Sequence, residues 1–187
     1  MINSTTGEPQ GILLDHLDLL TALDRSLPVL DLACGTGRNG LLLARRGIPV
    51  VFADRSAKAL EVVKQRLAEE GLSGRIWQVD LERPGPSPVC GQCFNAIIGF
   101  HYLHRPLFPD LLNAVKPGGL VVYETFTIRN RRFGRPNNPD FLLQPGELKS
   151  IFQAWEVVFH FEGIRQCPDR AVAQIVARKP CAEPDAM

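Results

Sequence analysis

The sequence lacks the features of membrane and secreted proteins. No apolar run approaches the roughly 20 residues that a bilayer-spanning helix requires. The opening stretch, MINSTTGEPQ, has no cationic lead of the kind that begins a secretory signal. The five cysteines are odd in number and irregularly spaced, which argues against a disulfide framework. These absences predict a cytoplasmic protein with reduced thiols and no membrane contact.

The protein also lacks a large net charge. The formal net charge is +1, which predicts no general attraction to nucleic acid, although a local basic patch is compatible with it. Cys90 and Cys93 form a single C-x-x-C without the second pair that a structural zinc site requires, so we expect no metal site. With 187 residues, of which 45% are hydrophobic, the chain is long enough for one well-buried core.

We therefore expect a single domain over residues 1–187, divided into four parts. These are an N-terminal helical region (1–27), a core (28–126), a loop that is a candidate lid (127–142) and a C-terminal helix and hairpin (143–187). Within the core, apolar runs alternate with segments of helical period, which predicts an α/β fold: a doubly wound, Rossmann-like parallel sheet with helices on both faces.

The periodicity also predicts where the elements lie. Strands are expected at 29–33, 49–54, 75–80 and 120–126, and residues 94–103 are expected to be a fourth strand that runs into its following loop. Helices are expected at 12–23, 41–47, 56–71, 107–115 and 146–154. The KPGG stretch at 116–119 is expected to be a turn. Two late runs, 155–164 and 171–179, are close enough in sequence to pair antiparallel.

The stretch VLDLACGTGRNG, residues 29–40, places a glycine loop directly after the first strand. Gly35, Gly37 and Gly40 satisfy the dinucleotide pattern G-x-G-x-x-G, which indicates that a ligand approaches bare backbone. Asp31 selects among ligands, because a carboxylate about 4 Å from a pyrophosphate is repelled by about 4 kcal/mol at an effective dielectric near 20. The same carboxylate attracts the ammonium group of S-adenosylmethionine.

Two more acids follow the next two strands. Asp54 ends the second strand and suits a ribose diol, which NAD and S-adenosylmethionine share. Asp80 ends the third, where it can accept from the exocyclic amine of adenine, with Leu81 and a side chain after the fourth strand beside the ring. Because ligands of open parallel sheets bind beyond the carboxyl ends of the strands, the row of acids predicts an S-adenosylmethionine site.

Together these stretches resemble the ordered motifs of class I S-adenosylmethionine-dependent methyltransferases, over about residues 28–126. The segments are VLDLACGTGRNG, VVFADRS, QVDLE, FNAIIGFHYLH and VKPGGLVVYETF. The resemblance implies a seven-stranded sheet ending in an antiparallel hairpin, S-adenosyl-L-methionine as cofactor and S-adenosyl-L-homocysteine as product. It implies cofactor contacts from Asp31, Ala33, Gly35, Gly37, Asp54, Arg55, Asp80 and Leu81. The candidate cofactor site also includes Cys34, Asn39 and Phe100.

A narrower resemblance concerns the GRN triplet of the glycine loop and the segment FLLQPGELKSIFQAWEVV. Both are similar to the tellurite-resistance methyltransferases, which methylate small soft oxyanion or thiol substrates. The arginine-containing segment 127–142 has no place in that family's pattern.

The candidate catalytic residues are His101, Tyr102 and His104 in FHYLH, just after the fourth strand. Histidine transfers protons near neutral pH, and an aromatic face stabilises a sulfonium. A base is needed only if the acceptor loses a proton, because orientation supplies most of the acceleration. Alternatively, His101 packs on adenine while Tyr102 and His104 cover the following helix.

The candidate acceptor contacts come from the fifth strand and the loop after it. Tyr123 and Glu124 point to opposite faces of a strand, and Tyr123 is the predicted contact. The loop 127–142 carries Arg129, Arg131, Arg132 and Arg135, of which the last three are predicted to bind an anionic acceptor. A solvated charged loop is the alternative.

Three functions remain open at this point. The first is methyl transfer from S-adenosylmethionine to a small-molecule acceptor. The second is methyl transfer to RNA or a protein side chain held by the Arg129–Arg135 loop. The third is a non-catalytic module that binds a dinucleotide.

Overall fold

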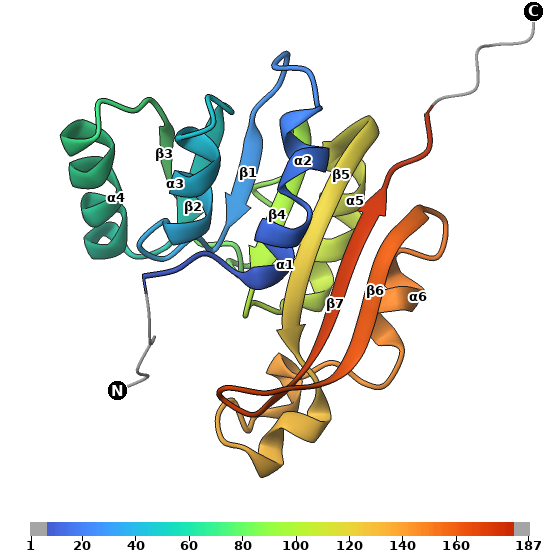
Figure 1. The fold of residues 1–187 in the computed structure, drawn as a ribbon. Helices are drawn as coiled ribbons and strands as arrows, with labels where there is room; N and C mark the ends of the chain where they lie inside the picture. Colours follow the sequence, from blue (N-terminus) through green and yellow to red (C-terminus); the bar gives the residue numbers. More distant parts are fainter. Residues whose placement is uncertain (1–6, 182–187) are drawn as a thin grey trace, which may run out of the picture.

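A seven-stranded sheet forms the centre of the computed structural model, which describes residues 7–181 (Figure 1). Its order is β3-β2-β1-β4-β5-β7-β6. The strands are β1 Val29–Leu32, β2 Val50–Asp54, β3 Arg75–Gln78, β4 Phe94–Phe100, β5 Val115–Phe126, β6 Glu156–Arg165 and β7 Arg170–Arg178. Strands β1 to β5 pair in parallel, whereas β7 runs antiparallel to both β5 and β6. The α/β prediction and the C-terminal hairpin are confirmed.

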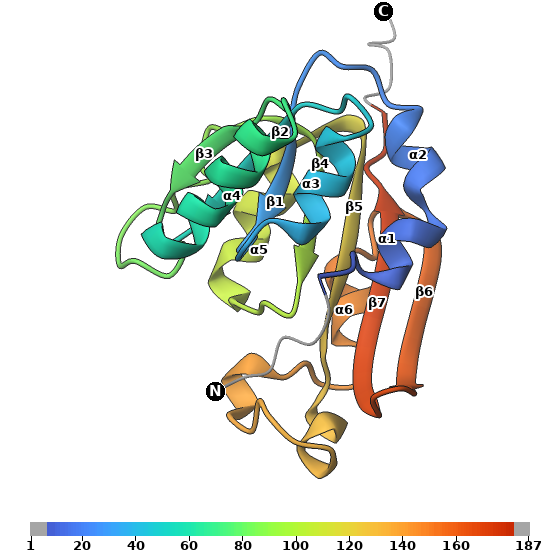
Figure 2. The same ribbon diagram turned by 60° about the vertical axis from the view of Figure 1, so that its left-hand side comes forward.

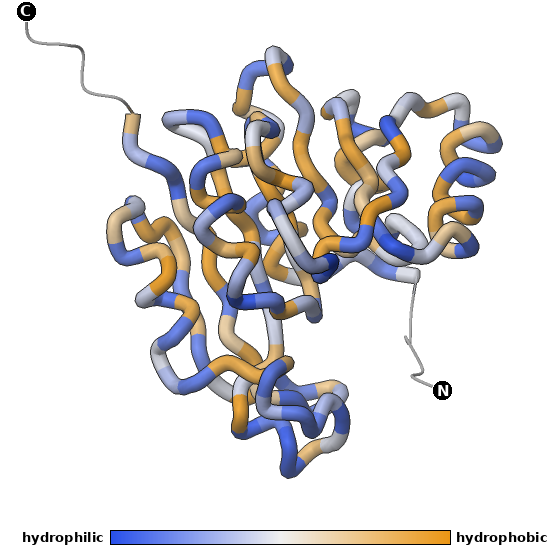
Figure 3. Tube along the Cα trace, turned by 180° about the vertical axis from the view of Figure 1, so that it is seen from behind, coloured by the Kyte–Doolittle hydropathy of each residue, from blue (hydrophilic) through white to orange (hydrophobic). Residues whose placement is uncertain are grey.

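Helices cover both faces of this sheet (Figures 1 and 2). The α-helices are α1 Gly11–Asp15, α2 Leu17–Thr21, α3 Arg38–Ala44, α4 Ala57–Glu69, α5 Phe108–Ala114 and α6 Glu147–Ile151, and the 3-10 helices are η1 Arg105–Leu107, η2 Ile128–Arg132 and η3 Pro139–Phe141. Helices α1 to α4 pack in one hydrophobic cluster, and α5 and α6 pack in the other. Hydrophobic residues therefore concentrate along the strands, with hydrophilic residues in the outer loops (Figure 3).

Beyond shifts of a few residues in the bounds, two predicted elements differ in kind from the observed ones. The helix expected at 12–23 is broken at His16, whose backbone leaves the helical region (φ −122°, ψ 20°), so two short helices replace it. The KPGG turn instead belongs to β5, which starts at Val115. There Gly118 adopts φ +74°, and the pairing of β4 with β5 shifts register between Phe94 and Ala96.

The segment 127–142 lies beyond the carboxyl end of β5 and is tied down at its base (Figures 1 and 2). Asn130 is 2% exposed; its Oδ1 accepts from the Ala171 amide (3.0 Å) and its Nδ2 donates to the Arg135 carbonyl (3.2 Å). Arg105 donates to the carbonyls of Asp140 and Leu142. The segment is therefore an ordered insert with two 3-10 turns, where the sequence predicted an irregular loop.

No helix within residues 7–181 is both long and apolar enough to cross a membrane. The predictions that concern residues 1–6 and 182–187, among them the absence of a secretory signal and the outer domain limits, lie outside the described residues.

Candidate cofactor and acceptor site

The glycine loop leaves β1 through a series of left-handed residues. Ala33, Gly35 and Gly37 have φ of +52°, +56° and +77°, and α3 begins immediately afterwards. Ala33 is one of three non-glycine residues with positive φ in the described chain, the others being His101 and Cys167. Such backbone costs of order 1–3 kcal/mol per residue and concentrates at functional sites.

The three glycines of the pattern have different surroundings. A Cβ at Gly35 would meet no atom within 4 Å, so this residue borders open space. A Cβ at Gly37 would lie 2.8 Å from Val63 Cγ2, and one at Gly40 would collide with the Phe52 ring. Gly35 thus allows a ligand to approach, whereas Gly37 and Gly40 allow α3 to pack against protein side chains.

A hollow of about 490 Å³ opens beside this loop, within the size range of ligand sites. Six predicted cofactor residues line it: Asp31, Ala33, Cys34, Gly35, Asn39 and Phe100. Arg38 and Arg66 line it as well and were not predicted. The hollow therefore offers both a carboxyl group and guanidinium groups to one ligand.

Asp31 is among the residues that line the hollow and is 1% exposed. Burial raises the pKa of its carboxyl group to about 7; the Gly40 N–H, which donates to Oδ2 at 2.9 Å, opposes the increase, and the nearby charge of Asp54 adds to it. A buried carboxylate of this kind is stabilised by any ligand that brings a positive charge.

Asp54 connects the first two strand ends. Its Oδ2 accepts from the Gly35 amide (2.8 Å), and its Oδ1 accepts from the Ser56 amide (2.8 Å). A carboxylate has about four lone-pair positions, so both oxygens retain capacity for a ligand hydroxyl. Asp54 thus holds the glycine loop in place, a role that its sequence position did not predict.

The other predicted cofactor residues stand further along the same edge. Asp80 is exposed and accepts from the Glu82 amide at 3.0 Å, Leu81 is buried in the core, and Arg55 is exposed. None of the three lines the hollow. Cys34 is half-buried, and burial raises the pKa of its thiol.

His101 lies at the end of β4, next to Phe100 of the hollow. Its backbone has φ +57°, its ring stacks on Phe126 (centroids 4.8 Å apart), and its Nε2 lies 3.2 Å from Glu124 Oε1. Glu124 is 1% exposed. Burial would raise the pKa of Glu124, but its hydrogen bonds with His101 and Gln174 hold that pKa below the usual value.

The structure corrects the choice between Tyr123 and Glu124. Tyr123 is 1% exposed, its hydroxyl donates to the Tyr102 carbonyl at 2.9 Å, and its ring packs against Phe108 in the core. The prediction that Tyr123 contacts the acceptor is therefore wrong, because no surface of it is available. Glu124 takes the side of the strand that faces His101. Period-2 alternation identified the two sides but not which one is covered.

The other two residues of FHYLH have different surroundings. Tyr102 packs against the same core as Tyr123, and burial raises the pKa of its hydroxyl. His104 precedes η1 and is partly exposed. The environment of Tyr102 agrees with the alternative given above, in which Tyr102 has a packing role and takes no part in catalysis.

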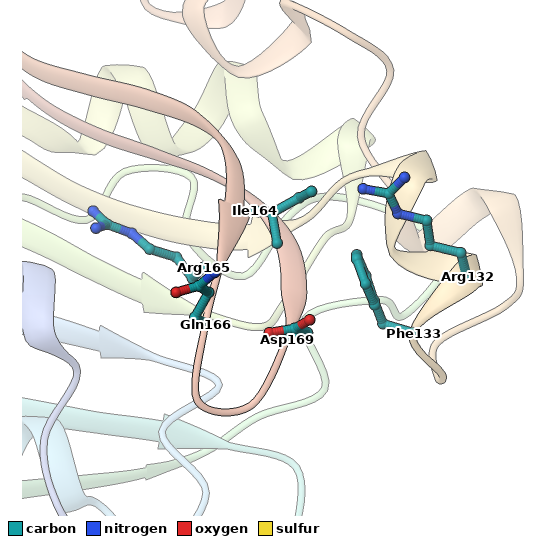
Figure 4. A pocket seen from close by; sticks show the side chains of 6 residues that line it. All are labelled: Arg132, Phe133, Ile164, Arg165, Gln166 and Asp169. Atoms are coloured by element: carbon teal, nitrogen blue, oxygen red, sulfur yellow. The ribbon is translucent and has the colours of Figure 1, made fainter.

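All four arginines of the insert are exposed. Arg132 lies over the Phe133 ring (4.6 Å) and faces Ile164 and Asp169 across an open hollow between η2 and the β6–β7 hairpin (Figure 4). Arg165 belongs to the same hairpin but extends in the opposite direction.

The strand order, the antiparallel C-terminal strand and the loop hollow after β1 define the class I fold of S-adenosylmethionine-dependent methyltransferases. Residues 29–119, just under half of the chain, match the family described as Methyltransferase domain. The structure of TehB from Haemophilus influenzae superposes with a TM-score of 0.76 at 20% identity, covering 91% of this chain and 62% of that one.

Curated relatives match over about half of this chain. The uncharacterized methyltransferase YodH of Bacillus subtilis is 31% identical over 97 residues, 51% of this chain and 41% of that protein. A trans-aconitate 2-methyltransferase of Azoarcus sp. is 33% identical, over 54% of this chain and 40% of that protein. The tRNA 5-carboxymethoxyuridine methyltransferase of Escherichia coli is 28% identical, over 60% and 46%. The matched region thus spans less than half the length of these relatives.

Proposed function

We propose that this protein transfers a methyl group from S-adenosylmethionine to a small acceptor that carries negative charge. The observation that carries the proposal is the hollow beside the glycine loop, with Asp31 in its lining and His101 next in sequence to Phe100, another lining residue. The domain match supports the reaction type, and the exposed arginines of the insert support the charge of the acceptor.

The residues of the hollow fit the amino-acid end of this cofactor. Asp31 offers a buried carboxyl group to the ammonium, while Arg38 and Arg66 offer positive charge to the carboxylate. Gly35 has no side chain to obstruct the approach. Asp54 would accept from the ribose hydroxyls, and Asp80 and Leu81 would border the adenine.

When bound, the cofactor supplies a methyl group on a positively charged sulfur. The protein's task is to align the acceptor with that group, and such orientation contributes up to roughly 7–11 kcal/mol in well-aligned reactions. The arginines of the insert would hold the anionic part of the acceptor by bidentate hydrogen bonds.

Calorimetric titration tests the cofactor assignment. We expect S-adenosylhomocysteine to bind and NAD not to bind. Asp54→Ala should weaken the binding by about 1.5–3 kcal/mol, because charged hydrogen bonds to the ribose and the anchor of Gly35 are both lost. Binding of NAD but not of S-adenosylhomocysteine would support the dinucleotide module instead. An unchanged dissociation constant in the variant would refute the role of Asp54.

Replacing Arg131 and Arg132 by alanine tests the acceptor assignment. The acceptor's KM should rise at least about tenfold, because charged hydrogen bonds are each worth about 1.5–3 kcal/mol, while the affinity for S-adenosylhomocysteine stays constant. The matched control is Arg45→Ala/Arg46→Ala, which removes the same amount of positive charge. These two arginines follow the last residue of α3, at the end of that helix away from the hollow, and Arg45 forms an exposed ion pair with Glu70 there. Equal KM changes in both double variants would contradict a specific site.

An RNA acceptor is the second candidate, favoured by the same exposed arginines. Incubation with total tRNA and methyl-labelled cofactor distinguishes the two. Label in the RNA, with binding that weakens steeply as salt increases, would replace the small-molecule proposal.

A further inference from the structure

His101 is held at two points by a single residue of the neighbouring strand. Its amide donates to the Glu124 carbonyl (2.8 Å), and its ring Nε2 lies 3.2 Å from Glu124 Oε1. Phe126, two residues further along the same face of β5, stacks against the ring. The ring is therefore fixed in place and direction although 31% of the side chain remains exposed. The backbone of His101 is also strained, with φ +57°, and the contacts around the residue hold it in that conformation.

Glu124 is in turn held by the last two strands. Gln174, its register partner on β7, donates from Nε2 to Glu124 Oε2, and Arg165 donates from Nη2 to Gln174 Oε1 at 2.6 Å. A guanidinium group only donates, so the oxygen of the Gln174 amide must face Arg165 and its NH₂ group must face Glu124. Along this series of hydrogen bonds, Arg165 fixes the orientation of the Gln174 amide, and the Gln174 amide fixes the group that faces Glu124.

The same logic determines the tautomer of the neutral imidazole. The carboxylate of Glu124 only accepts, so Nε2 of His101 must carry the hydrogen. Nδ1 then holds a free lone pair, and within residues 7–181 no hydrogen bond reaches it. Arg170 of β7 also approaches Glu124, with its Nε 3.9 Å from Oε1, and adds a positive charge beside that carboxylate.

We propose that His101 Nδ1 is the general base of the methyl transfer and that Glu124, Gln174 and Arg165 are positioning residues that set its tautomer. This inference rests on the proposed function. It implies an acceptor whose attacking atom carries a proton, such as a thiol or a hydroxyl, in contrast to an oxyanion that attacks without losing one.

The reaction forms one bond to the methyl carbon and breaks another. The acceptor atom bonds to the methyl carbon with its own electron pair, the carbon–sulfur bond breaks with its pair remaining on sulfur, and the acceptor's proton passes to Nδ1. The imidazolium that forms donates to the Glu124 carboxylate through Nε2. Proton transfer by a positioned side chain typically contributes about 10²–10⁴-fold to the rate.

Long-range proton–nitrogen NMR of the protein saturated with S-adenosylhomocysteine tests the tautomer directly. The chain has four histidines, and His101→Gln assigns the relevant signal. We expect neutral His101 to carry its proton on Nε2. In Glu124→Gln, the new amide must turn its oxygen toward the Gln174 NH₂ group and its own NH₂ toward His101, so the proton should move to Nδ1. A wild-type proton on Nδ1, or an unchanged tautomer in the variant, overturns the proposal.

Single-turnover methyl transfer provides the second readout, with 3-mercaptopropionate and selenite as probes. His101→Gln and Glu124→Gln should lower transfer to the thiol by about 100-fold or more, and should lower transfer to selenite, whose attacking atom loses no proton, by a much smaller factor. Equal thiol rates in wild type and His101→Gln overturn the proposal. Unchanged S-adenosylhomocysteine binding in both variants shows that they are folded, whereas no binding even in the wild type indicates failure of the proposed function instead.

Discussion

Asp31→Asn is expected to weaken binding of S-adenosylhomocysteine about 10- to 100-fold at pH 8, because the ligand's ammonium loses a charged partner. The wild-type affinity should fall as the pH drops below about 7, where the free protein's Asp31 becomes protonated. The affinity of the variant should not follow this pH dependence. Calorimetric titration between pH 5 and pH 8 measures both effects.

Asp31→Asn, which weakens ligand binding, should make the folded protein more stable relative to wild type as the pH rises. In the folded protein, burial raises the pKa of Asp31 to about 7, whereas an unfolded aspartate has a pKa of about 3.9. A carboxyl group whose pKa is raised by folding stabilises the fold at pH values below its pKa in the unfolded state. This contribution is lost as the pH rises through its pKa in the folded state. The free energy of unfolding of the variant, relative to wild type, should therefore increase by about 3–4 kcal/mol between pH 4 and pH 8.

Comparing the two pH values removes any constant cost of burying an asparagine amide. Urea unfolding of both proteins at each pH gives the result. A stability difference that does not change with pH would show that Asp31 is ionised at its ordinary pKa, and the electrostatic account of the hollow would then be incorrect.

Gly40→Ala should destabilise the protein by about 2–4 kcal/mol, because overpacking a rigid core forces buried groups apart. The added Cβ would collide with the Phe52 ring and lie 2.7 Å from Asp31 Oδ2. Phe52 is 0% exposed and Asp31 is 1% exposed, so neither can move into solvent.

Two further glycines provide controls for this experiment. Gly11→Ala meets no atom within 4 Å at the start of α1 and should change the free energy of unfolding by less than about 1 kcal/mol. Gly35→Ala places its Cβ in open space at φ +56°, so it should cost only about 1–2 kcal/mol of backbone strain while obstructing the ligand. Equal losses of stability at positions 35 and 40 would contradict the division between a ligand-facing and a packing glycine.

Much of this architecture could be read from local patterns. The order of strands and helices, the loop after β1 and the acids Asp31, Asp54 and Asp80 at or near successive strand ends follow from periodicity and from short-range rules. Those rules hold because side-chain direction repeats every two residues in a strand and every 3.6 in a helix, so each burial pattern leaves a local trace. The break at His16 and the extension of β5 through KPGG were missed because backbone pairing with distant segments outweighs turn propensity.

The parts that could not be read all depend on partners far apart in the chain. Gly40 is needed because Phe52 lies beneath it, and Asp54 anchors the loop because parallel pairing of β1 and β2 brings Gly35 to its carboxylate. Glu124 rather than Tyr123 faces the site because α5 and α6 cover the other side of β5. The series of hydrogen bonds that links Arg165, Gln174, Glu124 and His101 requires β7 to run antiparallel between β5 and β6. Sequence patterns encode the periodicity of each element, whereas the register between elements, and hence the proton position on His101, arises only when the sheet assembles.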